Sequence, residues 1–256
     1  MSDHLRTSIS EGILRLTLNR PEKKNALTLG MYEDLADALN NAAKDFAVRV
    51  AVLHGSGGSF TAGNDLFDFL NDPPKDETSP VFMFLRAIST FPKPLIAAVE
   101  GHAIGIGTTV LLHCDLAYAA SSARFQLPFV NLGLVPEAAS SLLLPHAVGP
   151  KRAAELLLFG DQFSAEDAYA AGLVNAVVAE GDVADYAMKK ARALVMKPPT
   201  SIRLTKSLLR EPNTAAVAST IVNEAGHFIR ALTGPEAQEA LAAFIEKRPP
   251  DFSQFD

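Results

Sequence analysis

The sequence predicts an α/β fold followed by an all-helical C-terminal region. Between residues 13 and 179, segments with strand composition alternate with amphipathic helical segments. This order of strand, helix and strand implies parallel strands joined by right-handed crossovers. From Asp182 onward the composition is helical and contains no strand pattern. We therefore expect an α/β core over residues 1–195 and a helical region over residues 196–256, of the kind that often supplies an assembly surface.

Composition and charge limit the classes of function. The chain has 256 residues, of which 48% are hydrophobic and 20% charged, enough apolar material for a large core. A net charge of −6, without a run of Lys and Arg, argues against a nucleic-acid binder. The single cysteine, Cys114, excludes an intramolecular disulfide and fits a reducing compartment. No stretch has the pattern of a signal peptide or the length of a membrane span, so we expect a cytoplasmic protein without a membrane partner.

The first predicted strand, residues 13–18, leads into a charged loop. The strand reads ILRLTL, and its alternating leucines share one face. The loop reads NRPEKKNALT, and its cations, Lys23 among them, form either a solvated turn or a contact to ligand phosphates. Thr28 then caps an amphipathic helix predicted over residues 29–46, and strand composition returns over residues 48–55.

A glycine-rich turn follows the second strand and reads GSGGSFTAGNDLFDF over residues 55–69. Glycine lets the backbone approach a ligand closely, so the amide of Asn64 is a candidate hydrogen-bond donor. Asp65 is either a catalytic acid or a helix cap. Residues 71–80 are polar and rich in proline, and we expect them to form a mobile surface loop near the ligand entrance.

A predicted helix over residues 81–91 and a third strand over residues 93–101 lead to a second glycine turn. Gly105 and Gly107 stand just before an apolar run. A tight turn at this place leaves the amide of Ile106 without an intrahelical partner, which suits an oxyanion or a phosphate. Alternatively, the glycine pair only lets a helix pack closely against a strand.

A lone carboxylate, Glu137, lies among small and apolar residues, after two short strands expected within residues 115–127. We expect Pro136 to begin a helix with Glu137 in its first turn, where an acid either complements the helix dipole or acts as a base. The helix start lowers the pKa of a carboxyl group, whereas burial against Phe129 and Leu134 raises it. The sequence leaves this balance open.

The remaining elements follow from capping signals and periodicity. Capping-box spacing between Ser164 and Asp167 predicts a short helix that ends before Gly172, and a last strand is expected over residues 173–179. Further helices are expected over residues 182–196, 202–209, 215–232 and 235–246.

Four motifs together resemble the crotonase (enoyl-CoA hydratase/isomerase) superfamily over nearly the whole chain. They read LNRPEKKNALT, SFTAGNDL, AAVEGHAIGIGTTVLLHCDLAYAASSARFQLPFVNLGLVPE and AAFIEKRPPDF. The resemblance implies a spiral of strand-strand-helix repeats with a C-terminal helical trimerisation region. It also implies an acyl-CoA thioester substrate, a homotrimer or a hexamer built as a dimer of trimers, and no separate cofactor, because coenzyme A is part of the substrate.

The resemblance also implies roles for individual residues. The amides of Asn64 and Ile106 would form an oxyanion hole, and the carbonyl of Ala62 would accept a hydrogen bond from the adenine amine. Lys23 would lie near the CoA phosphates. The residues expected to contact substrate or CoA are Lys23, Ala26, Ala62, Gly63, Asp65, Leu66, Gly105, Phe129, Leu132, Phe244 and Lys247, and no residue is expected to bind a metal.

The type of reaction is indicated by two absent carboxylates. Hydratases of this superfamily use two glutamates, and the corresponding positions here hold Thr109 and Phe129. Glu137 instead matches the single catalytic glutamate of the peroxisomal-type Δ3,Δ2-enoyl-CoA isomerases, a branch that GNDL and PFVNLG also match. Ala138 departs from that branch, which commonly has glycine at this position, and we expect the change to alter the pocket beside the base.

Three functions stay open at this point. The first is a Δ3,Δ2-enoyl-CoA isomerase with Glu137 as base. The second is a related acyl-CoA hydratase, lyase or hydrolase in which Glu137 acts with a loop residue such as Asp68 or Asp72. The third is an acyl-CoA-binding protein without turnover. A serine hydrolase is disfavoured because no Gly-x-Ser-x-Gly elbow exists, and a metal hydrolase because His102 and His113 form no close ligand pair and are better explained as packed core residues.

Overall fold

The structure, a computed structural model of the chain, describes residues 3–76 and 78–255. Its larger sheet has six strands, of which the first two are antiparallel and the others parallel. The predicted parallel strand units are therefore confirmed. In spatial order the strands are β1 (Leu5–Ser10), β2 (Ile13–Leu18), β3 (Val50–Gly55), β4 (Leu95–Val99), β6 (Leu116–Ala120) and β9 (Ala176–Val178).

A second, smaller layer of extended chain lies beside the larger sheet. Strand β5 (His102–Ile104) pairs in parallel with β7 (Arg124–Gln126), which pairs with β8 (Phe163–Ser164). Two isolated bridges, Thr61 with Ala103 and Leu27 with Asn64, continue this layer toward the N-terminus. Successive turns of the chain thus add one strand to the large sheet, one extended segment to the second layer and then a helix, which confirms the expected spiral.

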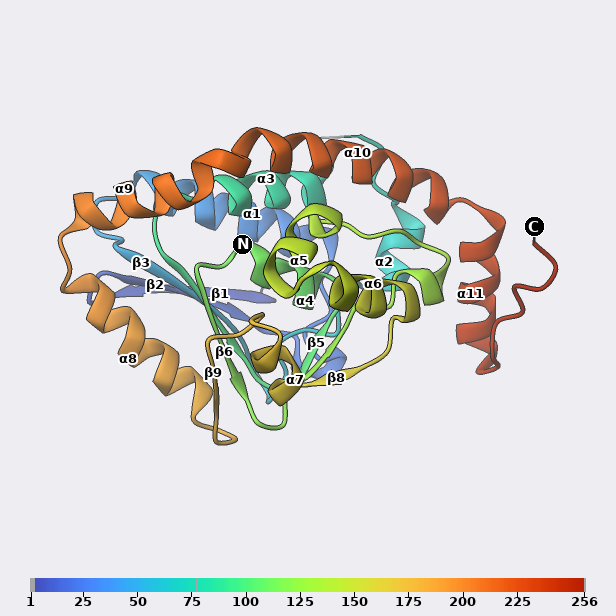
Figure 1. The fold of residues 1–256 in the computed structure, drawn as a ribbon, viewed down its shortest axis with the longest axis horizontal. Coiled ribbons are helices and arrows are strands. Elements are labelled where there is room, and N and C mark those ends of the chain that lie inside the picture. The colour runs from blue at the N-terminus through green and yellow to red at the C-terminus, as the bar shows by residue number, and fades with distance from the viewer. Residues whose placement is uncertain (1–2, 77, 256) are drawn as a thin grey trace.

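Side chains alternate between the two faces of the large sheet, and the hydrophobic core therefore has two parts. Ile13 and Ile96 belong to the face covered by α8 (Val183–Val195). Leu16 and Leu53 belong to the opposite face, which shares its core with α1 (Leu29–Lys44) and α3 (Pro80–Thr90). Because neighbouring strand residues point to opposite faces, β2, β3, β4 and β6 each contribute to both cores. Figure 1 shows α8 at the lower left and α3 above the sheet.

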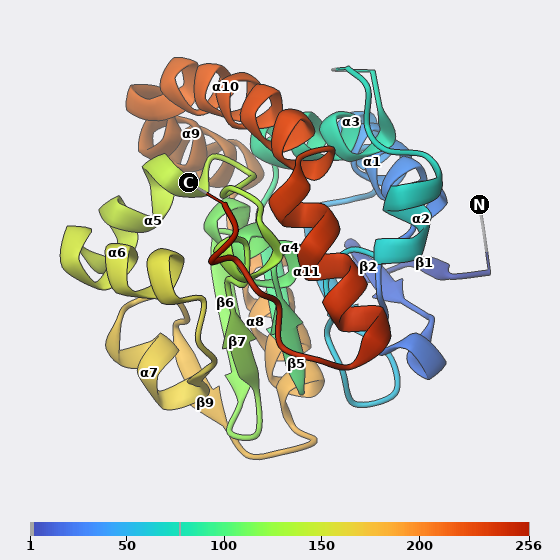
Figure 2. The same cartoon turned by 90° about the vertical axis from the view of Figure 1, so that its right-hand side faces the viewer.

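The C-terminal region is helical, as expected, and lies over one end of the core. Helix α10 (Thr214–Leu232) runs over α3 and contacts α5 (Ser140–Val148), and α11 (Pro235–Glu246) faces the viewer in Figure 2, beside α2 (Leu66–Asn71). Helix α9 (Pro199–Arg210) is fastened to the core by the ammonium group of Lys206, which lies 2.7 Å from a carboxylate oxygen of Asp115 and donates to the carbonyl of Lys93 at 2.6 Å. Within the described residues, no helix is both long and apolar enough to cross a membrane.

The elements that the sequence did not predict include β1, β5, β8 and α6 (Pro150–Phe159), and the predicted end of α1 was wrong. Strand β1 is mostly exposed and shows little alternation of apolar residues. Helix α1 ends at Lys44 rather than at Phe46, because the backbone leaves the helical region at Asp45, and the Phe46 side chain is 98% exposed. The other helices are α4 (Ile106–Thr109) and α7 (Ala165–Ala170), and the short 3-10 segments are Pro21–Lys23, Val110–His113, Val130–Leu132 and Glu211–Asn213.

Candidate active site

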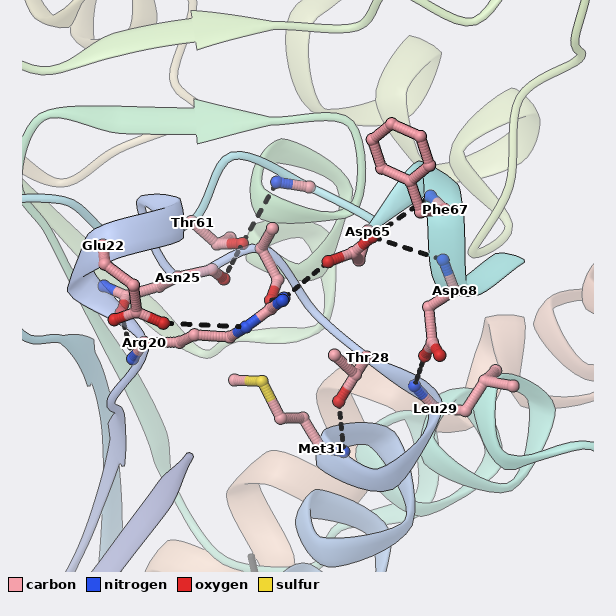
Figure 3. Close-up of polar contacts among 12 residues, drawn as sticks. Arg20, Glu22, Asn25, Thr28, Leu29, Met31, Thr61, Asp65, Phe67 and Asp68 are labelled. Atoms are coloured by element: carbon pink, nitrogen blue, oxygen red, sulfur yellow. Dashed lines mark hydrogen bonds and ion pairs between the residues drawn. The ribbon is translucent and has the colours of Figure 1, made fainter. Parts of the chain in front are cut away.

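Asn25 joins the first motif to the glycine-rich turn after β3. Its buried side-chain amide donates to the carbonyls of Ser56 at 2.8 Å and Ser59 at 2.6 Å, and its Oδ1 accepts from the amide of Arg20 at 2.7 Å. The hydroxyl of Thr61 donates to the Asn25 carbonyl at 2.7 Å. Every polar group of Asn25 therefore has a partner either in the first motif or in the glycine-rich turn after β3. These hydrogen bonds fix the position of the first motif relative to that turn. Figure 3 shows Asn25 beside Thr61.

Asp65 caps α2 and forms an ion pair with the first motif. Its Oδ1 accepts from the amides of Phe67 and Asp68, and its Oδ2 lies 2.7 Å from Nη1 of Arg20, a contact drawn in Figure 3. Although partial burial raises the pKa of Asp65, hydrogen bonds from Arg20 and from the α2 amides outweigh it and leave that pKa below its usual value. The cap interpretation is confirmed, and such a carboxylate is poorly suited to donate a proton.

The two glycine turns contact each other directly. The amide of Ile104 donates to the carbonyl of Thr61 at 3.1 Å. A Cβ atom added to Gly63 would lie 2.8 Å from the carbonyl oxygen of Ile104, and one added to Gly107 would lie 2.7 Å from Cγ2 of Thr61. The glycines are therefore required for close packing, as the simpler interpretation of the sequence holds, and this packing also brings Asn64 and Ile106 into adjoining turns.

The amides of Asn64 and Ile106 are both unused. The Leu27 amide donates to the carbonyl of Gly63, and the Leu27 carbonyl accepts from the amide of Asp65, each at 2.8 Å. These two hydrogen bonds form the β-bridge between Leu27 and Asn64, and in such a bridge the amide of the intervening Asn64 points away from Leu27. Gly105, with φ 56° and ψ −116°, adopts a conformation open essentially to glycine alone and places Ile106 at the start of α4. In the described chain neither amide donates a hydrogen bond, which leaves two donors for a ligand.

The helix that we expected at Pro136 does not form there. Helix α5 begins at Ser140, and the chain before it turns through Ala138 and Ala139, which have φ values of 60° and 55°. This left-handed conformation costs a non-glycine residue roughly 1–2 kcal/mol, which accounts for glycine at the position of Ala138 in the branch that the sequence resembles. Glu137 therefore precedes the turn, and the alternative role as an acid in the first turn of a helix is wrong.

Glu137 is a buried carboxyl group with an unpaired oxygen. Its side chain is 6% exposed, and its Oε1 has no hydrogen-bond partner in the part of the chain that is described. Burial, and secondarily the charge of Glu224, raise the pKa of Glu137 to about 8. Burial thus decides the question that the sequence left open.

Two adjoining apolar cavities are lined by five of the predicted site residues. Counting all space between the lining atoms, open solvent included, the larger spans about 580 Å³ and the smaller about 280 Å³. Asn64, Leu66, Leu132 and Phe244, four of the predicted residues, line the larger cavity, whereas Glu137 lines the smaller. Both cavities are bounded by Phe69 and Phe228, so they adjoin each other at these two rings.

The apolar groups around Glu137 differ from those that the sequence indicated. Phe69 of α2, Phe82 and Leu85 of α3 and Phe228 of α10 line its cavity. Phe129 is buried and Leu134 lines the larger cavity, but neither borders that of Glu137. The helices that bury the base are therefore distant from it in the sequence.

Eight of the predicted binding residues line neither cavity, and neither does the predicted oxyanion-hole residue Ile106. Lys23 and Lys247 are exposed, Ala26 and Ala62 are half-buried, and none of the four lines either cavity, nor do Gly63, Asp65, Gly105 and Phe129. Ala26 accepts a hydrogen bond from Arg20 at 3.1 Å. Their contacts with CoA stay predictions.

The loop acids considered as partners of Glu137 are engaged elsewhere. Asp68 accepts from the amide of Leu29 at 2.6 Å, as Figure 3 shows, and Asp72 pairs with Lys75 at 3.1 Å on the surface. Neither lines the cavity of Glu137. Among the described residues no group of three or more His, Cys, Asp or Glu side chains is arranged to hold a metal ion.

The sequence did not indicate two polar residues beside Glu137. The buried ring of His113 donates from Nε2 to the carbonyl of Ala138 at 2.7 Å, and burial lowers the pKa of His113 to about 4, so the ring is neutral. Glu224 of α10 accepts hydrogen bonds from the amides of Ala139 and Ser141. The signal that could have indicated Glu224 is that it is the single acid of a largely apolar helical segment.

Comparisons with known proteins give consistent matches. The family model described as enoyl-CoA hydratase/isomerase matches residues 8–255. Enoyl-CoA delta isomerase 2 of Rattus norvegicus is 35% identical over 244 residues, which are 93% of this chain and 62% of that protein, so the chain spans less than two thirds of this relative. The 2,3-dehydroadipyl-CoA hydratase of Escherichia coli (strain K12) is 33% identical over 248 residues, 96% of each chain.

A crystal structure gives a close spatial match. The enoyl-CoA hydratase/isomerase from Pseudoalteromonas atlantica T6c superposes with a TM-score of 0.94 at 44% identity. The match covers 98% of this chain and 100% of that one.

Contact between the two glycine turns can be tested at Gly63. We expect Gly63→Ala to destabilise the protein more than Gly58→Ala, as measured by denaturant unfolding. Both glycines have positive φ, but a Cβ at Gly58 meets no atom within 4 Å, whereas one at Gly63 meets the Ile104 carbonyl at 2.8 Å. The left-handed conformation costs about 1–2 kcal/mol in both variants, and overpacking adds roughly 1–3 kcal/mol at Gly63. An equal loss of unfolding free energy in Gly63→Ala and Gly58→Ala would show that the two glycine turns do not contact each other.

The raised pKa of Glu137 predicts a dependence of stability on pH. A carboxyl group whose pKa rises on folding from 4.5 to about 8 favours folding below pH 4.5, and this contribution is lost as pH increases through about 8. Relative to Glu137→Gln, the wild type should therefore lose on the order of 4 kcal/mol of unfolding free energy between pH 4.5 and 9. Unfolding measured at a series of pH values checks this, and parallel curves for the two proteins would contradict it.

Proposed function

Because the chain belongs to the enoyl-CoA hydratase/isomerase family, we propose that it is a Δ3,Δ2-enoyl-CoA isomerase, which converts a 3-enoyl-CoA to the trans-2-enoyl-CoA. The observation that carries the proposal is Glu137, a carboxyl group buried in an apolar cavity with one oxygen unpaired in the described chain. A pKa of about 8 suits a group that must both take and return a proton near neutral pH.

The proposed reaction needs one base and two donors. The Glu137 carboxylate removes a proton from C2 of the substrate, negative charge moves to the thioester oxygen as a dienolate forms, and the proton returns at C4. The amides of Asn64 and Ile106 hold the oxygen, since they are the unused donors of the adjoining turns. Loss of one such donor typically lowers the rate 10²- to 10³-fold, and general-base catalysis contributes roughly 10²- to 10⁴-fold.

The proposed binding mode places the acyl part in the apolar cavities and CoA at their outer side. Leu66, Leu132 and Phe244 supply apolar walls near Asn64. Lys23 is assigned to the CoA phosphates and the carbonyl of Ala62 to the adenine amine. Lys247, exposed at the end of α11, would lie near CoA as well.

We further propose that residues 196–256 assemble the protein as a homotrimer or as a dimer of trimers. Support comes from α9 and from the C-cap residue of α8, where Met196, Leu204, Leu208 and Leu209 are exposed. Apolar side chains gathered on one helix commonly mark a protein interface.

Hydration is the rival reaction that one observation favours. Glu224 and Glu137 line the same cavity, and a relative named as a hydratase is 33% identical. A hydratase would need the second carboxylate to exchange a proton with water. Glu224 is poorly placed for this because its oxygens accept hydrogen bonds from two amides and a hydroxyl. The hydroxyl of Thr109, buried where hydratases carry a glutamate, cannot replace that carboxylate.

We predict that the wild type isomerises a 3-enoyl-CoA faster than it hydrates a 2-enoyl-CoA, and that Glu137→Gln lowers isomerisation by about 10²- to 10⁴-fold. Absorbance of the conjugated thioester reports both reactions. Glu166→Gln, which removes an exposed carboxylate far from the cavities, should retain wild-type rates.

Three results would contradict the proposal. Isomerisation that survives in Glu137→Gln would exclude Glu137 as the base. Hydration that proceeds faster than isomerisation in the wild type would support the hydratase. CoA-thioester binding without either reaction would indicate a binding protein.

A further inference from the structure

Glu224 is a buried carboxylate of α10 whose surroundings are otherwise apolar. Its side chain is 6% exposed, and its neighbours Ala225 and Phe228 belong to the hydrophobic core. A charge in such a place is retained only where hydrogen bonds compensate its lost hydration. Those hydrogen bonds all come from the turn that follows Glu137.

The carboxylate of Glu224 caps α5 from another helix. Its Oε2 accepts from the amide of Ala139 at 2.6 Å, and its Oε1 accepts from the amide of Ser141 at 2.9 Å and from the Ser141 hydroxyl at 2.5 Å. Ala139 occupies the N-cap position of α5 and has no side-chain oxygen that could fulfil this role. Glu224 therefore satisfies amides that the first turn of α5 leaves without partners.

The capped turn connects directly to Glu137. Ala138 and Ala139 both have the left-handed conformation, which persists only where the surrounding structure holds it. His113 holds the Ala138 carbonyl, Glu224 holds the Ala139 amide, and the amide of Ser140 donates to the carbonyl of Glu137 at 3.0 Å. The direction in which Glu137 leaves the turn thus depends on these contacts.

We propose that Glu224 is a positioning residue for Glu137, which orients the base through the Ala138–Ala139 turn and adds its own carboxylate to the same cavity. The proposal rests on the proposed function only in taking Glu137 as the base. Glu224 itself touches the turn and not the substrate.

The charge of Glu224 has a consequence for protonation. Two carboxyl groups that line one apolar cavity do not readily ionise together, so the second proton is lost only at higher pH. Burial raises the pKa of Glu224 as well, but three donors oppose this shift, whereas Oε1 of Glu137 has no donor in the described chain. Glu137 therefore keeps its proton to the higher pH and becomes the base once it ionises.

The other titratable groups nearby do not supply a compensating positive charge. Tyr32 of α1 faces Glu137 and stays neutral, because burial and the Glu137 charge raise its pKa well above the usual value. His113 is neutral, and Arg210 is engaged with the carbonyl of His113 and with Asp115. The residues of α2 and α3 that line the cavity are apolar.

The test uses Glu224→Gln, which keeps the side-chain size and removes the charge, and Glu224→Ala, which also removes the cap. Glu236→Gln is the control, since it removes an exposed carboxylate from the first turn of α11. The pH at which Glu137 titrates in the ligand-free protein is read by infrared difference spectroscopy against Glu137→Gln. The pH dependence of kcat/KM, and kcat and KM separately, are measured with a 3-enoyl-CoA.

We expect Glu224→Gln to lower the titration midpoint of Glu137, and the acidic limb of kcat/KM, by about one pH unit or more. Both Glu224 variants should lower kcat roughly 10- to 100-fold, with KM changed much less, because the base is misplaced. Glu236→Gln should match the wild type in every readout.

An unchanged midpoint in Glu224→Gln, or a kcat equal to that of the wild type, would overturn the proposal. A lower unfolding temperature with an unaltered pH profile would also overturn it, because it would show a purely structural cap. Should Glu224→Ala fail to fold, Glu224→Gln still decides between these outcomes. Full isomerase activity in Glu137→Gln would refute the proposed function instead, while the titration in ligand-free protein would still report on the two carboxylates.

Discussion

Burial without a full set of hydrogen bonds disfavours the ionised form of a carboxyl group. Glu137 is buried in this way by the elements packed around it. Aromatic rings from α2, α3 and α10 exclude water from one side, and a second carboxylate, Glu224, faces the same cavity. The same burial that makes the group costly to ionise raises its proton affinity to a value useful near neutral pH. Stability and reactivity are therefore coupled at this one residue.

The oxyanion-binding part of the site depends on backbone packing rather than on side chains. Asn25, Arg20 and Asp65 fasten the first motif to the turn after β3, and the glycines allow this turn to contact the one after β5. Because the donors are amides, side chains as different as those of Asn64 and Ile106 occupy these positions. The spiral supplies the geometry, since each turn of it places one extended segment beside the previous one.

Much of this arrangement follows from local patterns in the sequence. Alternating leucines in β2, the Thr28 cap of α1 and the capping box at Ser164 each reflect interactions within a few residues, and the structure confirms them. The glycine turns were likewise visible. The turn at Ala138 was not, because two alanines in a left-handed conformation are stabilised by His113 and Glu224, which are distant in sequence. For the same reason the local pattern predicted a helix at Pro136, and the burial of Glu137 by α3 and α10 could not be foreseen.

The central claim, that one carboxylate and two amides act on the same thioester, is tested most directly by a crystal structure with a bound, non-reactive 3-enoyl-CoA analogue. We predict that the thioester oxygen lies about 2.7–3.1 Å from the amide nitrogens of Asn64 and Ile106. We also predict that a Glu137 oxygen lies about 3–3.5 Å from C2. A thioester oxygen bound elsewhere, or a different side chain beside C2, would contradict the central claim.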